Sequence, residues 1–506
     1  MSASFPLAVK DVVRLLSSLL LREQEMPGGV VETFVCDSRR AEKNSLFCAL
    51  AGTGFDGHDF IREVLEKGAS LVIAERVPEG DYPGKERILP VRDSHKAWGV
   101  LTHFSYGCPG SSFPLFAVTG TNGKTSIAFF LKKIWENCFS APCGLISTVA
   151  YKTGSSAHEE EGVRTTPSSE KIFSLLAEME KNHCCSCMME ASSHGLIQSR
   201  LYPLSFAGSI FTNLTGDHLD YHKNMENYYQ AKKLLFTRYS AAQESCSLIN
   251  IDDPWGKRLY RELKEELCSE VISFSFREEA DAKGVILSMT SSGGNFSLSF
   301  RGKEYLCHLP LIGKHNLYNG AQALVMALAK GLPEKRVLEA LQSPHLAPPG
   351  RLEPFLLPSS GRVFVDYAHT HDALENVLKA LKPLTEKRLL VLFGCGGDRD
   401  RTKRPKMGAV AVKYADKVFL TSDNPRGEDP ETILSEIAAG IGKEDLFKIF
   451  RESDRRKAIH KALMEMEEGD LLLIAGKGHE NTQEIKGKFF PFDDREEVRN
   501  FIEEMK

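Results

Sequence analysis

The stretch LFAVTGTNGKTSIAFFLKKIWENC, residues 115–138, decides the fold of this chain. It starts with apolar residues that predict a buried strand, and it then turns through a glycine-rich segment. After the turn, apolar residues recur at the spacing of one helix face, namely Ile127, Phe130, Leu131, Ile134 and Cys138. A strand, a tight turn and a helix in this order are the unit of an α/β fold with a parallel sheet. We therefore expect a central domain of this class.

The turn itself, GTNGKTS at residues 120–126, has the composition of a phosphate-binding loop. Its glycines let backbone N–H groups approach phosphate oxygens, at a helix N-terminus that favours anions. Lys124 adds a positive charge, and the Thr125 hydroxyl can reach Mg²⁺. The usual spacing would place a further glycine at Val118, so the loop is a shortened form. An ordinary strand-to-helix turn is the alternative, but we expect ATP to be bound here, by Gly120, Thr121, Asn122, Gly123, Lys124, Thr125 and Ser126.

Composition and length describe a globular protein of several domains. The chain has 506 residues, about three times the ~150 residues of a typical domain. Its net charge of -4 gives no indication of nucleic-acid binding, and no run of ~18 apolar residues predicts a membrane span. Its 12 cysteines do not make a disulfide scaffold and suit a reducing compartment. We expect a cytoplasmic monomer with no nucleic-acid partner and no membrane insertion.

Two segments rich in Gly, Pro and Ser, residues 105–114 and 343–351, divide the chain. They predict an N-terminal α/β domain at residues 1–110, a central domain at 111–346 and a C-terminal domain at 347–506. The last two alternate apolar runs with helical patterns, as parallel sheets with crossover helices do. The first residues predict an amphipathic helix instead of a signal peptide, with an apolar face made by Val12, Leu16, Leu19 and Leu20.

In the C-terminal part, four apolar runs each end at a loop dense in charge and glycine: RVFVDYAHTHD, RLLVLFGCGGDRD, KVFLTSDNPR and DLLLIAGKGHE. The carboxyl ends of parallel strands meet at one edge of a sheet, where ligands bind. We therefore expect the four loops to line one crevice that contains Arg426 of DNPR. The strand before Arg426 cannot continue through Pro425, which lacks an N–H group. The basic run at residues 399–406 is interpreted as a site for an anion or a substrate, in preference to nucleic acid.

Two further strands of the central part end in residues that bind metals. EASSHG follows an apolar run and supplies Glu190, and TGDHLDYH supplies Asp217 and His218. A carboxylate and an imidazole beside a phosphate-binding loop suit a hard cation that is held together with phosphates. Each of these side chains alone could be a solvated strand end, and for Asp217 the two interpretations are balanced.

A pair of lysines follows in the helical pattern NMENYYQAKKLLF, for which Asn224 is the expected N-cap. At about 100° per residue, Lys232 falls on the apolar side with Tyr228, whereas Lys233 is turned toward solvent. Burial lowers the pKa of an ammonium group toward that of a neutral, nucleophilic amine. Such an amine could react with CO₂ to form a carbamate, which is an oxygen ligand for Mg²⁺. The alternative is a lysine whose ammonium group reaches the surface along Tyr228.

A set of motifs then occurs in one order: GTNGKT, TTP, EASSHGLIQSR, TNLTGDHLDYH, YYQAKKLLF, DYAHTHDAL, GCGGDRDRTKRP, DNPR and AGKGHE. In this set the chain resembles the Mur ligases, from Ser38 of DSRR to Glu480, which is nearly its whole length. The resemblance implies an α/β protein of three domains. These are a uridine-nucleotide-binding domain, a central ATPase domain with a P-loop, and a Rossmann-like domain that brings in an amino acid.

Within this family the motifs resemble most closely the ligase that adds the third residue of the peptidoglycan stem peptide. The implied substrates are ATP, UDP-MurNAc-L-Ala-D-Glu and meso-diaminopimelate, and the implied cofactor is Mg²⁺. ATP would phosphorylate the free carboxylate of D-Glu, and the incoming amine would attack the acyl phosphate to form an amide. Two alternatives stay open: a related ligase that adds another amino acid such as L-lysine, and a P-loop ATPase without ligase activity.

The resemblance also implies roles for individual residues. Lys232 matches the carbamoylated lysine (N6-carboxylysine) of the family, and the implied catalytic residues are Lys124, Lys232, Glu190 and His218. The Mg²⁺ ligands would be Thr125, Glu190, His218 and the carbamate of Lys232. Further contacts to ATP would come from Asn316, Arg351, Asp366 and His369. Contacts to the UDP-sugar dipeptide would come from Ser38, Thr165, Thr166, Ser192, Gln198 and Arg200. Diaminopimelate would be bound by Arg399, Asp423, Asn424, Pro425, Arg426, Gly476 and Glu480.

Overall fold

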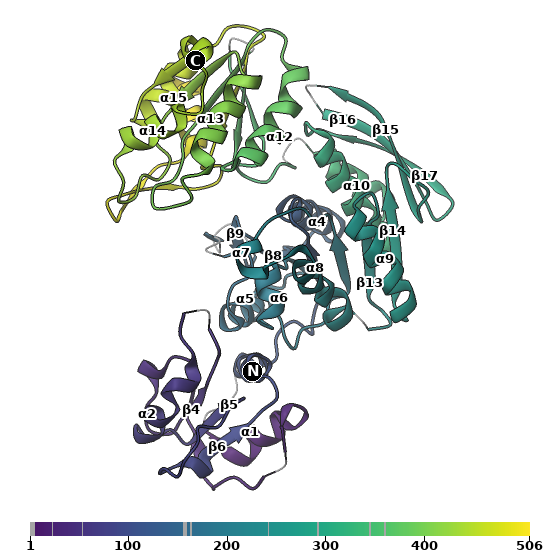
Figure 1. Cartoon of the computed structure of the whole chain (residues 1–506). Coiled ribbons are helices and arrows are strands. Elements are labelled where there is room, and N and C mark those ends of the chain that lie inside the picture. Colours follow the sequence, from purple (N-terminus) through teal and green to yellow (C-terminus); the bar gives the residue numbers. More distant parts are fainter. Residues whose placement is uncertain are drawn as a thin grey trace. The chain divides into compact units, whose positions relative to one another are not determined.

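The computed structural model describes residues 6–22, 24–52, 54–154, 159–161, 164–240, 242–290, 293–343, 346–358 and 361–505 (Figure 1). Contacts within the chain divide it into two compact units, residues 1–281 with 325–336 and residues 282–324 with 337–506. The predicted domain boundaries after residues 110 and 346 remain predictions. Residues 344 and 345 of the predicted second linker lie outside the described residues. Among the helices that the structure describes, none is both long and apolar enough to cross a membrane.

The N-terminal part of the first unit is a small parallel sheet covered on both faces. Its strand order is β3-β4-β5-β6, with β3 Thr33–Val35, β4 Ser45–Cys48, β5 Leu71–Ala74 and β6 Ile88–Pro90. Helices α1 Val9–Leu15 and α3 Ser94–Ser105 pack on one face, and α2 Ile61–Glu66 packs on the other. The short strands β1 Leu7–Ala8 and β2 Val30–Val31 pair separately. The predicted amphipathic helix is α1 and a short 3-10 turn after it, which together bury Val12, Leu16 and Leu19.

The central sheet places the phosphate-binding strand in its middle. Strand β7, Leu115–Thr119, lies between two parallel neighbours, β11 Cys187–Glu190 and β12 Gly208–Phe211. The order β10-β9-β8-β11-β7-β12-β13-β14 is completed by β8 Gly144–Ile146, β9 Ala150–Lys152, β10 Glu159–Glu161, β13 Cys246–Asn250 and β14 Glu270–Ser275. Every residue of β7 and β11 is buried, which explains why these strands are apolar up to their last residues, Thr119 and Glu190.

The helices of this sheet include α4 Lys124–Phe139. The centroid of its Trp135 ring lies 4.6 Å from the centroid of the Phe116 ring in β7. The other helices are α5 Ser169–Lys181, α6 Ser193–Ile197, α7 Leu219–His222, α8 Met225–Leu234 and α9 Pro254–Glu266. Helices α5, α8 and α9 share one core cluster with the central strands. The helix predicted after the phosphate loop is therefore confirmed, as is Asn224 as the N-cap of α8, where its side chain accepts a hydrogen bond from the Asn227 N–H group at 2.8 Å.

The second unit begins with three antiparallel strands, β15 Ala282–Thr290, β16 Gly293–Phe300 and β17 Lys303–Leu309. Helices α10 Lys314–Ala329 and α11 Glu334–Leu341 follow in the chain. Buried residues alternate with exposed ones along β17, as expected for a sheet with one covered face.

The C-terminal sheet confirms the four apolar runs as parallel strands. They are β19 Arg362–Asp366, β20 Leu389–Phe393, β21 Lys417–Leu420 and β23 Leu471–Ala475, in the order β18-β19-β23-β20-β21-β22. The edge strands are β18 Glu353–Leu356 and β22 Ile449–Arg451, and a separate hairpin consists of β24 Thr482–Ile485 and β25 Lys488–Pro491.

Helices cover both faces of this sheet, because alternate strand residues belong to two different core clusters. Val391 and Leu473 pack with α12 His371–Leu381, α13 Lys403–Tyr414 and α14 Pro430–Ala438. Leu390 and Leu472 pack with α15 Arg455–Met464 and α16 Asp494–Glu504. The carboxyl ends of β19, β20, β21 and β23 therefore open onto the same edge.

Candidate functional site

The phosphate-binding loop has the geometry that its glycines predict. Gly120 has a φ of 144° and Gly123 a φ of 87°, in the region that glycine adopts without strain. A Cβ atom on Gly120 would collide with the side chain of Thr212. The Lys124 ammonium group lies over the loop and donates to the carbonyl oxygens of Gly120 at 2.9 Å and Thr121 at 2.8 Å. A positive charge and backbone N–H groups thus lie together at the start of α4.

Glu190 lies at the end of β11, directly beside this loop. Its carboxylate is 1% exposed, and Oε1 accepts hydrogen bonds from the Thr125 hydroxyl at 2.8 Å and the Thr148 N–H group at 3.0 Å. Strand β11 pairs in parallel with β7, so its last residue, Glu190, lies at the sheet edge from which the phosphate-binding loop continues. Thr148, in the turn between β8 and β9, was not identified from the sequence, because a single threonine in a short turn carries no distinctive pattern.

The pair formed by Thr125 and Glu190 fits a magnesium ion. Mg²⁺ takes hard oxygen ligands and is usually bound through one or two carboxylates together with substrate phosphates. In the part of the chain that the structure describes, no three His, Cys, Asp or Glu side chains form a metal cage of their own. A cation held by a carboxylate, a hydroxyl group and phosphate is therefore the arrangement that these residues suit.

His218 lies farther out than Glu190. Its ring is half exposed, lies 3.5 Å from a carboxylate oxygen of Asp217, and has a ring centroid 6.2 Å from that of Tyr228. The His194 ring stands edge-on to it at 5.2 Å. Tyr228 connects His218 to the loop, since its hydroxyl group lies 3.4 Å from that of Thr121.

Lys232 lies on the apolar side of its helix, as predicted, and it is buried there. It is 1% exposed, donates a hydrogen bond to the Gly120 carbonyl at 2.8 Å, and lies 4.6 Å from the centroid of the Tyr228 ring. The alternative in which its ammonium group reaches the surface is therefore wrong. Burial, together with the nearby charge of Lys124, lowers the pKa of Lys232 well below its usual value.

The neighbouring Lys233 was expected to face solvent, and the structure places it in ion pairs instead. Only 15% of its side chain is exposed, and its ammonium group pairs with Glu262 at 2.9 Å and Glu266 at 2.7 Å, both on α9. The expectation that it faces solvent is wrong, because α9 packs beside α8 in the first unit. The sequence could not indicate which helix covers this face.

All residues expected at the UDP-sugar dipeptide except Ser38 lie in a hydrogen-bonded group beside Glu190. The Thr166 hydroxyl donates to the Glu190 carbonyl at 2.7 Å and accepts from the Ser192 N–H group at 2.9 Å. Arg200 donates to the Thr166 carbonyl at 2.6 Å and to the Gln198 side chain at 3.0 Å. The hydroxyl groups of Thr165 and Thr148 are 2.9 Å apart. Ser38 lies in the N-terminal part, where its carbonyl accepts a hydrogen bond from the Lys67 ammonium group at 3.0 Å.

Of the remaining residues expected at ATP, three lie together in the second unit. The Asp366 carboxylate, at the end of β19, accepts hydrogen bonds from the N–H groups of Leu352 and Ala368, each at 2.8 Å. Burial raises the pKa of Asp366, and the positive charge of Arg351 partly offsets this. The Arg351 guanidinium lies 4.9 Å from the Tyr367 ring centroid, and His369 is exposed two residues further on. Asn316 lies in the first turn of α10 and donates to the Ile312 carbonyl at 2.8 Å.

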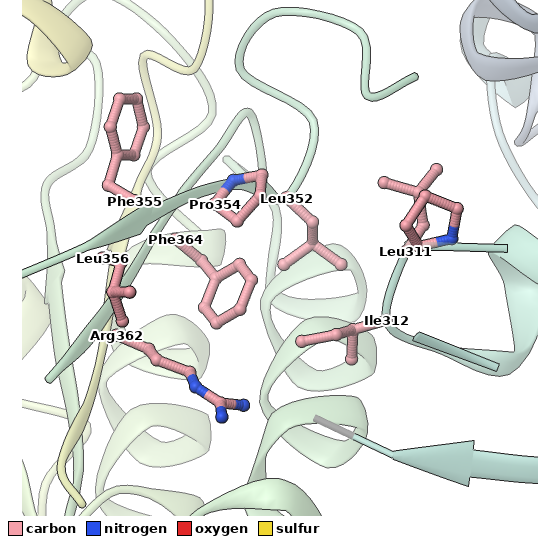
Figure 2. Close-up of a pocket in the computed structure, with 9 residues that line it drawn as sticks. Leu311, Ile312, Leu352, Pro354, Phe355, Leu356, Arg362 and Phe364 are labelled. Atoms are coloured by element: carbon pink, nitrogen blue, oxygen red, sulfur yellow. The ribbon is translucent and has the colours of Figure 1, made fainter. Parts of the chain in front are cut away.

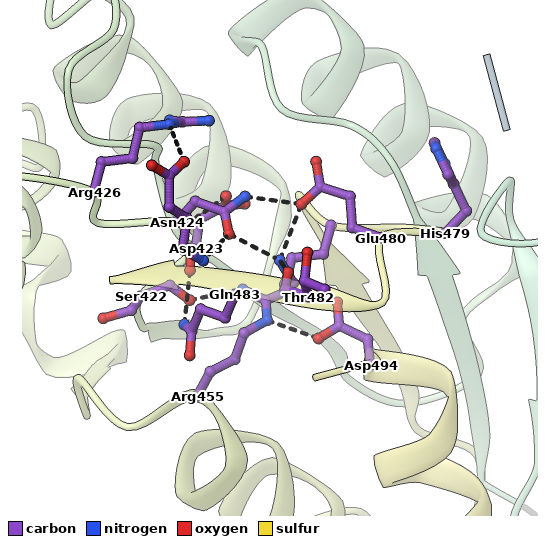
Figure 3. Close-up of polar contacts among 12 residues, drawn as sticks. Ser422, Asp423, Asn424, Arg426, Arg455, His479, Glu480, Thr482, Gln483 and Asp494 are labelled. Carbon is purple, nitrogen blue, oxygen red and sulfur yellow. Dashed lines mark hydrogen bonds and ion pairs between the residues drawn. The ribbon is translucent and has the colours of Figure 1, made fainter. Parts of the chain in front are cut away.

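The loops after β21 and β23 are joined by polar side chains (Figure 3). The Asn424 amide donates to Glu480 Oε2 at 2.8 Å, and the buried Lys477 ammonium group donates to the same oxygen at 2.9 Å. Asp423 lies against Gly476, where a Cβ atom would be 2.6 Å from the Asp423 carboxylate. The strand ends of β21 and β23 therefore lie together, and a crevice lined by all four loops stays a prediction.

Arg426 is held between the loop after β20 and strand β24. Its backbone has a φ of 51°, and its N–H group donates to the Glu484 carbonyl at 3.0 Å. The guanidinium donates through Nε to Glu484 Oε2 at 3.0 Å and through Nη1 to the Gly397 carbonyl at 2.9 Å. Glu484 was not identified from the sequence, since it lies four residues after the last motif. Arg399, also expected here, is exposed in the loop after β20.

The basic run at residues 399–406 contributes less to ligand binding than its charge suggests. Arg404 is fully buried and donates to the carboxylates of Glu428 and Glu436, at 2.9 and 2.6 Å. Arg401 also donates to Glu428. The expectation of an anion site is therefore wrong for Arg404, which connects α13 to α14 and to the segment before it, and it stays a prediction for Arg401.

An apolar pocket of about 330 Å³ lies elsewhere in the second unit (Figure 2). It is lined by residues 310–312 and by β18 and β19, and Arg362 is its charged group. None of the residues expected to be functional lines this pocket, and we assign no ligand to it.

Comparison with known proteins identifies relatives along almost the whole chain. A family model described as "Mur ligase family, catalytic domain" matches residues 31–106, "Mur ligase middle domain" matches 118–327, and "Mur ligase, glutamate ligase domain" matches 350–478.

Two curated relatives carry the same name, UDP-N-acetylmuramoyl-L-alanyl-D-glutamate--2,6-diaminopimelate ligase. The protein of Aquifex aeolicus is 40% identical over 472 residues, which cover 93% of this chain and 94% of that protein. The first such ligase of Clostridium acetobutylicum is 39% identical over 471 residues, with 93% and 94% covered. A solved structure of a ligase of this name superposes with a TM-score of 0.71 at 30% identity and covers 99% of both chains.

Proposed function

The chain belongs to the Mur ligase family, and we propose that it adds meso-diaminopimelate to UDP-MurNAc-L-Ala-D-Glu in an ATP-dependent reaction that releases ADP. This reaction elongates the stem peptide of a peptidoglycan precursor. We infer that the protein acts in the cytoplasm, where its nucleotide substrates are made, and that it acts as a monomer.

The observation that carries this proposal is that the loops after β21 and β23 supply one residue of each charge, Arg426 and Glu480. The far end of meso-diaminopimelate bears both an ammonium group and a carboxylate. Arg426 offers a guanidinium for the carboxylate, and Glu480 offers a carboxylate for the ammonium group. L-Lysine lacks the far carboxylate, so its ammonium group would meet the like charge of Arg426.

The phosphoryl transfer is assigned to the first unit. The N–H groups of the loop at residues 120–123 would hold the ATP phosphates, and Lys124 would offset the negative charge that develops during transfer. Thr125 and Glu190 would hold Mg²⁺, which neutralises phosphate charge when it is bound. The group formed by Thr166, Ser192 and Arg200 lies beside Glu190 and would orient the acceptor carboxylate of D-Glu.

The chemistry then proceeds in two steps. An oxygen of the D-Glu carboxylate attacks the terminal phosphorus of ATP, the bond to ADP breaks, and an acyl phosphate forms. The amine of diaminopimelate attacks the acyl carbon, and collapse of the tetrahedral species releases phosphate and leaves the amide. The amine loses one proton in this step.

Lys232 is proposed to carry a carbamate. Its buried amine favours the neutral form, whose lone pair can attack CO₂ with loss of a proton, forming N6-carboxylysine. The carbamate would add oxygen ligands beside the phosphate loop. The test is isotope-labelled CO₂: a labelled carbamate signal should appear in the wild-type protein and be absent from Lys232→Met. No signal, with full activity in CO₂-free buffer, would contradict it.

The proposed reaction is tested by coupled measurement of ADP release. ADP should form only when UDP-MurNAc-L-Ala-D-Glu and meso-diaminopimelate are both present, and L-lysine should substitute poorly. ATP turnover with neither acceptor would instead indicate an ATPase without ligase activity. Preference for L-lysine would assign the chain to a different branch of the family.

A further inference from the structure

A buried ion pair lies beside the residues of the proposed amino-acid site, below Asn424 and Glu480 in Figure 3. Arg455 is the first residue of α15 and Asp494 is the first residue of α16. Both side chains are 0% exposed. The guanidinium donates to the two carboxylate oxygens in parallel, from Nε to Oδ1 and from Nη2 to Oδ2, each at 2.7 Å. This bidentate geometry fixes the plane and the orientation of the arginine.

The same guanidinium holds the ends of two strands. Nη1 donates to the Ser422 carbonyl at 3.1 Å, and Nη2 donates to the Ala475 carbonyl at 3.0 Å. Ser422 immediately precedes Asp423, and Ala475 immediately precedes Gly476. One rigid group therefore sets the separation of the two loops that carry the proposed contacts to diaminopimelate.

A second buried cation completes the connection on the ligand side. All three donors of the Lys477 ammonium group are used, by Asn424 Oδ1 at 3.2 Å, Glu480 Oε2 at 2.9 Å and the Thr482 carbonyl at 2.6 Å. This arrangement orients the Asn424 amide and occupies one oxygen of Glu480. The exact placement of both side chains thus depends on the separation of the loops behind them.

We propose that Arg455 and Asp494 are positioning residues for the acceptor amino acid. They act through the Ser422 and Ala475 carbonyls to set the distance between Arg426 and Glu480, and so favour a substrate with both charges at its far end. This inference rests on the proposed function. Stability alone does not require such a pair, because a buried ion pair is often no more stabilising than apolar residues of similar volume.

The chain contains a control pair at the opposite end of the same sheet, although its arginine is 38% exposed. Arg388 precedes β20, Asp470 precedes β23, and the arginine Nε donates to both Asp470 oxygens at 3.2 Å. Arg388 also donates to the Glu465 carbonyl at 2.9 Å. This pair has the same chemistry and also holds a backbone carbonyl, but it lies at the amino ends of the strands, away from the loops of the proposed site.

The experiment compares Arg455→Lys and Asp494→Asn with Asp470→Asn, using the full chain. We expect the KM for diaminopimelate to rise about tenfold or more in the first two variants, because small displacements of binding groups are costly, while the KM for ATP changes less than about twofold. Asp470→Asn should lower the midpoint of thermal unfolding and leave both KM values near those of the wild type. Equal effects of all three variants on the KM for diaminopimelate would overturn the proposal.

A double variant guards against failure of the single variants to fold. Arg455→Met with Asp494→Leu replaces the pair by apolar groups and should fold, yet it cannot hold the two carbonyls. The double variant should show the raised KM for diaminopimelate and a weaker preference for diaminopimelate over L-lysine. A folded double variant with wild-type KM and preference would overturn the inference. Failure of the wild-type protein to use diaminopimelate would instead overturn the proposed function, and a different acceptor, if used, would be tested in the same set of variants.

Discussion

The Lys232 ammonium group donates a hydrogen bond of 2.8 Å to the carbonyl of Gly120, the first residue of the phosphate-binding loop. A buried amine and a phosphate site thus share one backbone group, although the two residues are far apart in the sequence. Burial in this apolar environment disfavours the ammonium form of Lys232, and the contact satisfies one donor of the buried nitrogen. It also gives Lys232 a measurable signature in the pH dependence of folding.

Replacement of Lys232 by Met should change how stability depends on pH. The pKa of Lys232 is lowered in the folded state. Between that pKa and the unfolded value of about 10.4, the unfolded chain therefore binds more protons than the folded chain. The free energy of unfolding then rises with pH, by up to about 1.4 kcal/mol per pH unit. Relative to Lys232→Met, the wild-type protein should therefore gain stability between pH 7 and about 10. Denaturant unfolding in CO₂-free buffer measures the difference.

Lys233→Met is the matched control for this experiment. Burial alone would lower the pKa of Lys233, but hydrogen bonds from its ammonium group to Glu266 and Glu262 raise it. The contribution of Lys233 to the free energy of unfolding is therefore fully present below about pH 10.4 and is lost only as the pH rises above that value. For each variant, the difference from wild type in the free energy of unfolding is followed from pH 7 to about 10. An equal change of this difference for Lys232→Met and Lys233→Met would contradict the lowered pKa of Lys232.

Replacement of Arg426 by Ala should abolish the preference for diaminopimelate. Loss of charge-assisted hydrogen bonds of about 1.5–3 kcal/mol predicts a fall in kcat/KM for diaminopimelate of roughly tenfold to a hundredfold. The KM for ATP should stay near the wild-type value. Arg451→Ala, an exposed arginine of β22, is the control. Unchanged turnover of diaminopimelate by Arg426→Ala would refute the proposed role.

Replacement of Lys477 by Met should raise the KM for the amino acid and lower stability together. The methionine leaves the buried Asn424 side chain and the Thr482 carbonyl without their shared donor, which costs about 1–3 kcal/mol per unsatisfied group. Thermal unfolding and steady-state kinetics measure the two effects. A variant that is destabilised but binds diaminopimelate normally would show that Lys477 acts only on folding.

Replacement of Glu190 by Gln should increase the Mg²⁺ concentration needed for half-maximal activity. The amide keeps the size of the side chain and one acceptor oxygen, but it lacks the charge that a hard cation prefers. ADP release measured across a magnesium titration is the readout. Glu262→Gln, on α9, changes a carboxylate outside the proposed site and should leave the titration unchanged.

Local sequence chemistry determined the elements and many of the candidate residues. Glycine spacing and apolar periodicity are set by neighbours in the chain, so the loop at residues 120–123, helix α4 and the place of Lys232 on the apolar side of its helix could all be predicted. The four parallel strands of the C-terminal sheet followed from their apolar runs in the same way. The motifs then indicated the family and the residues expected at each substrate.

Only the tertiary structure decided which distant groups pair. The sequence placed Lys233 in solvent because it does not specify that α9 covers α8, and it grouped Arg404 with ligand-binding cations because it does not show Glu428 and Glu436 nearby. Arg455 and Asp494 begin two separate helices, a position where charged residues are usually solvated. Packing of both helices on one sheet face buries them together, and burial is what converts two ordinary charges into a fixed bidentate pair.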